Sequence, residues 1–247
     1  MRNMKYLTIF LLVTSAVAVI AKDLPEFLHV CKRNDPNINE CIKASVEHLR
    51  PYLVKGVPEY QIPSIEPLLL RELVAAEGGG LKLSAKDVNA YGASDFSVTK
   101  MNADMGTFTY LLDVFLPHLS IDGQYEIDGK VLLLPITGSG RLTGNFTDCL
   151  GAVKFTAETE TMNGVEYFRV REFNLKITVG KGVLRLDNLF GGDKVIGDVV
   201  NNAINNNFDA FIKELMPIVE RALGTAFRDI GQNIVNQFTY DQLFPLD

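Results

Sequence analysis

The sequence lacks tryptophan and is poor in metal-binding side chains, with three cysteines and three histidines among its 247 residues. His29, His48 and His118 show no ligand spacing with the cysteines, so no metal site is predicted. Also missing are the G-x-S-x-G, H-E-x-x-H and Walker patterns that mark a nucleophile elbow, a zinc protease and a nucleotide site. We therefore predict that the chain is not an enzyme and needs no cofactor.

An excess of positive charge is missing as well. The chain has 24 lysines and arginines against 30 aspartates and glutamates, a net charge of −6. Arg2 and Lys5 lie in a segment that we expect to be removed, which leaves 22 basic residues and a net charge of −8. An acidic surface disfavours nucleic acid and anionic membranes as partners.

Only one long apolar run is present. Residues 6–20 follow Arg2 and Lys5 and end in the small residue Ala21, which is the pattern of a secretory signal peptide. The alternative, a membrane anchor, would need roughly 20 apolar residues and a positive cluster after them. We predict a signal peptide over 1–21 and a single secreted, monomeric domain over 22–247 with no stable membrane insertion.

Export favours a disulfide among the few cysteines. Cys31 and Cys41 are close in sequence, and the turn-forming stretch Asn34-Asp35-Pro36-Asn37 lies between them, so we predict a bridge that closes this loop. Cys149 is then left over, either as a buried free thiol or as half of an intermolecular bridge. Asn145-Phe146-Thr147 is an acceptor sequon for N-glycosylation at Asn145.

Hydrophobic periodicity divides the rest of the chain. Residues 42–53 have helical spacing, whereas residues 68–187 alternate with a period near two, as in long antiparallel strands with one apolar face. Asp122-Gly123 and Asn163-Gly164 predict turns, and Gly138-Ser139-Gly140 predicts a bend or bulge.

From Asp193 onward the period becomes helical. Two apolar rows, one through Val200 and Ile204 and one through Val199 and Ala203, predict a wide apolar face. Asn188 or Asp193 is expected to cap this long helix, and Pro217 to kink it over residues 213–216. An α+β fold follows, in which a large curved antiparallel sheet wraps the C-terminal helix.

Five stretches, taken in chain order, carry a family resemblance. They are the proline-rich residues 56–68, DVNAYGASDF at 87–96, IDGQYEIDGKVLLLPITGSG at 121–140, DNLFGGDKVIGDVVNNAINNNF at 187–208 and YDQLFP at 240–245. Together they resemble the takeout and juvenile-hormone-binding protein family of insects. The resemblance implies an elongated α/β-wrap with an internal hydrophobic tunnel, a Cys31–Cys41 bridge, secretion, and carriage of a juvenile-hormone-like terpenoid, fatty acid or other lipid. It also implies a link to circadian, feeding or chemosensory physiology.

The sequence departs from the family pattern at two positions. Members that bind juvenile hormone strongly carry a second disulfide, and Cys149 has no later cysteine to pair with, so the chain looks more like the takeout branch. The helix motif often ends in tryptophan, where this chain has Phe208. These departures leave hormone specificity open.

The candidate ligand-lining residues lie on the apolar sides of the strands and of the helix. Ordinary core packing is the alternative for each of them. Tyr110 and Tyr125 are the most informative, because a hydroxyl in an apolar wall needs a partner, which a ligand, water or the backbone could provide. A signalling or interaction protein of the same fold, without an exchangeable ligand, is the alternative function. The candidates are Phe108, Tyr110, Leu112, Val114, Tyr125, Ile127, Val131, Leu133, Phe155, Val200, Ile204, Phe208, Phe211 and Leu215.

Overall fold

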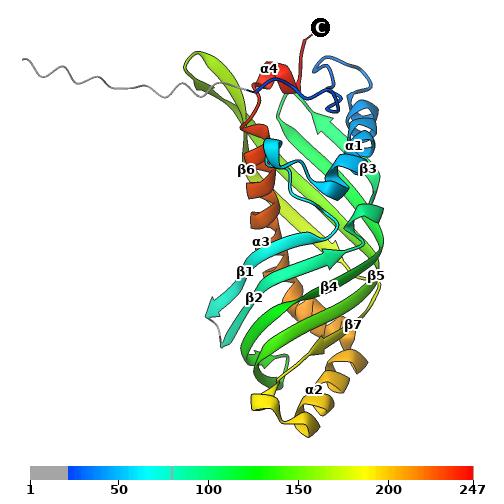
Figure 1. Cartoon of the computed structure of the whole chain (residues 1–247), viewed down its shortest axis with the longest axis vertical. Coiled ribbons are helices and arrows are strands. Elements are labelled where there is room, and N and C mark those ends of the chain that lie inside the picture. The colour runs from blue at the N-terminus through cyan, green and yellow to red at the C-terminus, as the bar shows by residue number, and fades with distance from the viewer. Residues whose placement is uncertain (1–21, 79, 247) are drawn as a thin grey trace, which may run out of the picture.

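The computed structural model describes residues 22–78 and 80–246, and of residues 74–78 only the backbone. The expected signal peptide, 1–21, lies outside the described residues. Within them no helix is long and apolar enough to cross a membrane. The elements in chain order (Figure 1) are α1 (Ile38–Lys55), η1 (Pro58–Tyr60), β1 (Leu68–Gly78), β2 (Leu81–Tyr91), η2 (Ala93–Asp95), β3 (Ser97–Asp104), β4 (Thr109–Val131), β5 (Leu134–Met162), β6 (Val165–Thr178), β7 (Lys181–Leu186), η3 (Phe190–Gly192), α2 (Lys194–Asn206), α3 (Phe208–Val235) and α4 (Tyr240–Leu243).

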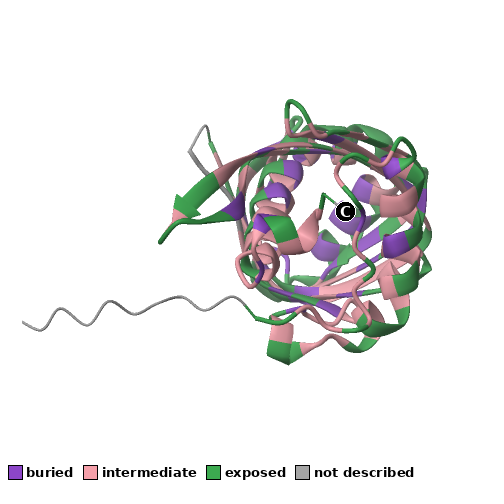
Figure 2. Cartoon of the chain, turned by 90° about the horizontal axis from the view of Figure 1, so that it is seen from above, coloured by how far each residue is buried: buried purple, intermediate pink, exposed green. Residues whose placement is uncertain are grey.

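A long antiparallel hairpin, β4–β5, forms the centre of the sheet. Strands β2 and β3 pair along β4, and β6 and β7 pair along β5, while β1 extends the sheet beyond β2. Seen along the long axis, the strands curve around the helical segment (Figure 2). The predicted α+β wrap is confirmed: the sheet is not closed, and helix α3 runs between its two edges, in contact with β1 and β6.

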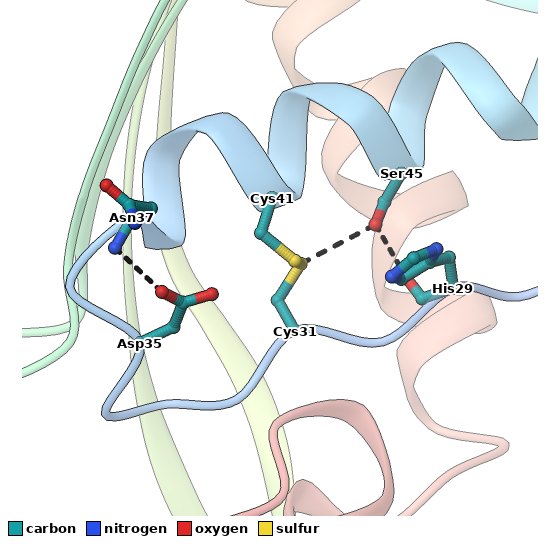
Figure 3. The surroundings of a disulfide bond; sticks show 6 residues. All are labelled: His29, Cys31, Asp35, Asn37, Cys41 and Ser45. Atoms are coloured by element: carbon teal, nitrogen blue, oxygen red, sulfur yellow. Dashed lines mark hydrogen bonds between the residues drawn. A yellow bond between two sulfur atoms is a disulfide. The ribbon is translucent and has the colours of Figure 1, made fainter.

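The predicted disulfide is present at one end of the molecule. Cys31 and Cys41 are bonded and tie the N-terminal segment to α1 (Figure 3). Ser45 lies one turn after Cys41; its hydroxyl donates to the main-chain oxygen of His29 at 2.7 Å and contacts the Cys31 sulfur at 3.5 Å. Asp35 accepts from the main-chain N–H of Asn37 at 2.8 Å and fixes the turn inside the loop.

Side chains from α2 and α3 seal one open edge of the sheet. The amide of Asn201 accepts from Leu186 N at 2.9 Å and donates to Leu186 O at 2.9 Å, and Asn205 does the same for Leu184 at 2.8 Å. On β6, Gln232 bridges Val170 N and Phe168 O, and Glu220 accepts from Ile177 N at 2.8 Å. An unpaired strand edge costs free energy when it is buried, and when exposed it can pair with other chains. These helix side chains therefore supply hydrogen bonds that a neighbouring strand would otherwise make.

The predicted turn at Asp122-Gly123 is wrong, whereas the one at Asn163-Gly164 is confirmed between β5 and β6. Gly123 lies inside β4, where a Cβ atom would come within 2.9 Å of the Val88 Cα on β2. The glycine therefore permits a close approach of two strands next to the bulge in β2.

The predicted helix interruption lies elsewhere than expected. The chain breaks at Asn207 (φ −123°, ψ 35°), between α2 and α3, and α3 continues through Pro217. The start is as predicted, because Asp193 caps α2 by accepting from Val195 N and Ile196 N. In α2 only the row through Val200 and Ile204 faces the core, since Val199 is 62% exposed. In α3 both rows do, because Phe208 of the first row and Phe211 and Leu215 of the second are buried.

Candidate ligand-binding site

The inward face of the central hairpin is defined by strand register. Tyr110 pairs with Phe155, and Leu116 with Cys149; Tyr110 and Cys149 are buried. Alternate residues between them, Leu112 and Val114 on β4 and Gly151 and Val153 on β5, share this face. Farther along, at Asp148 (φ +55°), the alternation shifts by one residue, and Phe146 and Leu119 continue the inward face.

Three hydrophobic clusters cover parts of this face, and the first two meet at Leu119 and Ile121. The largest joins β4, β5, β7, α2 and the start of α3; a second joins β1, β2 and the middle of α3; a third, rich in aromatic rings, joins Tyr110, Phe168 and Tyr240 at the disulfide end. Leu112, Val114 and Val153 lie between the first and third clusters, are only half-buried and belong to none of them. The core is therefore interrupted in the middle of the sheet.

Glycines report how tightly each region is packed. At Gly182, in the largest cluster, a Cβ atom would lie 2.3 Å from the ring of Phe208, and at Gly144 it would lie 2.6 Å from the ring of Phe146. At Gly151, in the middle of the sheet, only Leu175 Cδ1 among the described atoms would come within 4 Å, at 3.9 Å. Packed protein interiors leave few such spaces, so the inward side of Gly151 has room for additional atoms.

The structure divides the fourteen predicted lining residues among four places. Leu112 and Val114 face the interrupted part of the core, and Tyr110, Phe108 and Phe155 belong to the aromatic cluster or pack against it. Leu133 lies on the surface, outside the interior. Missed by the prediction are Gly151 and Val153, the strand partners of Val114 and Leu112, although alternation from Phe155 was a signal that could have found them. The remaining eight fill the largest cluster: Tyr125, Ile127, Val131, Val200, Ile204, Phe208, Phe211 and Leu215.

The prediction for Leu133 is wrong. Alternation from Val131 directs Leu133 inward, but the chain turns between β4 and β5 at this point, with Leu132 at φ +57°, and Leu133 is 93% exposed. The turn lies at the same end of the molecule as α2 (Figure 1), where Val195 and Val199 are also exposed. We call Leu132, Leu133, Val195, Ile196 and Val199 the α2-end patch.

The two informative tyrosines differ in their partners. The Tyr125 hydroxyl donates to the main-chain oxygen of Asp187 at 2.7 Å, and burial, with the nearby Asp187 charge, raises the pKa of Tyr125 to about 12. The Tyr110 ring is stacked on Phe155, and its hydroxyl has one hydrogen-bond partner among the described residues, the Met105 sulfur, a weak acceptor, at 3.6 Å. Burial also raises the pKa of Tyr110, so this hydroxyl stays protonated, and the Tyr110 side chain is only 2% exposed.

The other candidate groups lie apart from this interior. Cys149 is a buried free thiol, and burial raises its pKa, which makes it a poor nucleophile. Asn145 is exposed on the outer face of β5, beside His118, and lines an outer groove of about 380 Å³ with Tyr91 and Val183. No group of three histidine, cysteine or acidic side chains within the described part of the chain could hold a metal ion.

An elongated antiparallel sheet wrapped around a helix, with an apolar and incompletely filled inner face, is typical of a protein that encloses a hydrophobic molecule. The sequence matches the family described as haemolymph juvenile hormone binding protein over residues 8–245, and the chain belongs to this family.

Relatives and a solved structure extend the match over most of the chain. The circadian clock-controlled protein daywake of Drosophila melanogaster is 27% identical over 237 residues, which cover 91% of this chain and 89% of that protein. The "Putative beta-carotene-binding protein" of Schistocerca gregaria is 23% identical over 214 residues, with 86% of each chain covered. The crystal structure of Epiphyas postvittana Takeout 1 superposes with a TM-score of 0.72 at 21% identity, over 87% of this chain and 99% of that one.

Proposed function

We propose that the protein is a secreted carrier that holds a hydrophobic small molecule, such as a terpenoid, a fatty acid or another lipid, between the inner face of the sheet and helix α3. The observation that carries the proposal is the interrupted core, where Leu112, Val114 and Val153 stay half-buried around the open side of Gly151. Apolar surface left uncovered inside a protein is costly, and a lipid that covers it gains about 0.8 kcal/mol for each buried methylene. Membership of a family named for hormone binding supports the proposal.

The orientation of the ligand follows from the aromatic end of this space. Tyr110, whose hydroxyl lacks a strong acceptor, lies beside the uncovered stretch and can donate to a carbonyl, an ester or an epoxide of the ligand. We propose that the polar end of the ligand points to Tyr110 and that its hydrocarbon part covers Leu112, Val114 and Val153.

The decisive experiment fills the space with a side chain of the protein itself. Gly151→Leu should abolish saturable uptake of the uncharged fluorescent probe N-phenyl-1-naphthylamine, because the new side chain occupies the ligand's place. The matched control is Ala152→Leu, which is next in sequence but exposed on the other face of β5 and should bind as the wild type does. Equal binding by Gly151→Leu and the wild type would disprove the proposed location.

The alternative function, an interaction protein without an exchangeable ligand, is favoured by one observation, the α2-end patch. Five large apolar side chains are exposed at one end of the molecule, and such patches commonly mark contact surfaces. The probe experiment separates the two functions, since an interaction protein would take up no probe in the interior even as the wild type.

We further propose that residues 1–21 direct secretion and are removed, that the domain over 22–247 is monomeric, and that Asn145 carries an N-linked glycan. The Cys31–Cys41 bond supports secretion, and the exposure of Asn145 on the outer face of the sheet supports the glycan.

A further inference from the structure

We propose that the ligand enters and leaves sideways, through a groove between α3 and the end of β6. This inference rests on the carrier function proposed above, because a passage has a role only if the interior exchanges a ligand. The groove has a volume of about 360 Å³. Its apolar lining is Ile177 and Val179 of the β6 end together with Phe208, Ile212, Met216 and Pro217 of α3.

The groove adjoins the interrupted part of the core at one residue, Ile177. Ile177 on β6 is the strand partner of Gly151 on β5, and the two residues share a face with the pair Val153 and Leu175. Ile177 therefore both lines the groove and is the neighbour of Gly151 across the β5–β6 pair. In the proposed passage, a molecule moves past Ile177 toward the space beside Gly151.

The groove also lies in a gap in the seal between helices and sheet. The last residue of β6 that is hydrogen-bonded to a helix is Ile177, whose N–H donates to Glu220 of α3. The next such residue along the chain is Leu184 on β7, whose N–H donates to Asn205 of α2. Among the described residues no hydrogen bond joins the helices to residues 178–183. The break between α2 and α3 at Asn207 lies opposite this stretch, so only side-chain packing closes the seam there.

The rim of the groove indicates which molecules can pass. Lys176 and Lys213 are balanced by Asp209 and Glu220, and Lys176 is already paired with Glu220 at 2.7 Å. The rim therefore has no net charge, and the walls beyond it are apolar. An uncharged, mostly hydrocarbon molecule fits this passage, because a charged group would lose its hydration along the apolar walls beyond the rim.

The test changes the width of the passage at Met216, a half-buried groove residue, in both directions. Met216→Trp should slow both association and dissociation of N-phenyl-1-naphthylamine about tenfold, and Met216→Ala should accelerate both. The dissociation constant should stay within about twofold, because a passage changes neither the bound nor the free state. Val183→Trp, which places the same ring in the outer groove of the sheet, is the control and should leave both rates unchanged.

Stopped-flow fluorescence gives the two rates, and thermal unfolding verifies that each variant is folded. Unchanged rates in both Met216 variants, with normal equilibrium uptake, would overturn the passage and leave the carrier function intact. A change in the dissociation constant at an unchanged association rate would also overturn it, since Met216 would then be part of the binding wall. A wild-type chain that takes up no probe would remove both proposals together.

Discussion

At the scale of single residues, Glu66 makes a testable contribution to acid stability. Its carboxylate accepts hydrogen bonds from Gly92 N at 3.0 Å and from Ser94 N and the Ser94 hydroxyl at 3.3 and 2.9 Å. Burial acts to raise the pKa of Glu66, but these hydrogen bonds outweigh it and hold the pKa below the ordinary value of 4.5. The stabilisation is therefore complete above the ordinary pKa and is lost as pH falls through the lowered one.

Replacement of this carboxylate should remove part of the pH dependence. We expect Glu66→Gln to be less stable than the wild type at pH 7 and to approach it as the pH falls to about 3. Urea unfolding at a series of pH values measures this difference. Ser94→Ala removes one donor and should give an intermediate slope. A constant gap between the two proteins at every pH would contradict the assignment.

Residue roles were only partly predictable from the sequence. Alternation alone places Tyr110 and Tyr125 on the inner face, but their partners differ because the Asp187 carbonyl that satisfies Tyr125 lies 62 positions away in the chain. The error at Leu133 has a local cause, since an apolar run that contains a turn looks the same as an apolar run that continues a strand.

At the scale of elements, the asparagines of α2 should act as a substitute for a strand. Asn201 makes hydrogen bonds to the N–H and C=O of Leu186 and is buried. Asn201→Leu leaves both of these main-chain groups unpaired, and we expect it to lower the free energy of unfolding by about 3 kcal/mol. Asn202→Leu, next to it on the exposed face, should change stability by less than about 0.5 kcal/mol. Urea denaturation measures both variants, and similar values for the two would refute the edge-sealing role.

The sequence predicted which elements exist better than where they end. Periodicity identified α1, the strands and the C-terminal helix, because each buries one face. It did not identify the break at Asn207, since the usual helix-breaking signal, Pro217, lies in a helix that continues through it. A signal for the edge seal was present: Asn201 and Asn205 are four positions apart, as two neighbouring residues on one helix face must be.

At the scale of the whole molecule, the wrap could be expected, whereas its unfilled middle could not. An apolar helix face and apolar strand faces must be buried against each other, whatever the register between the strands. The space beside Gly151 exists because its strand partners are Val114 and Ile177 and because the buried clusters end on either side of it. Register depends on bulges such as the one between Thr156 and Ala157, which no periodicity in the sequence reveals.

The unfilled space in the middle of the sheet should also affect the free energy of unfolding. A carrier that leaves apolar surface uncovered when empty should gain stability from any side chain that covers it, so binding and stability should oppose each other at Gly151. In the ligand-free protein we expect Gly151→Leu to raise the free energy of unfolding by about 1–2 kcal/mol relative to Gly151→Ala, which also removes the backbone freedom of glycine but adds little bulk. Chemical denaturation after organic extraction of bound lipid gives both values. If leucine at this position is instead less stable than alanine, the region is already full, and the interior has no space for a ligand.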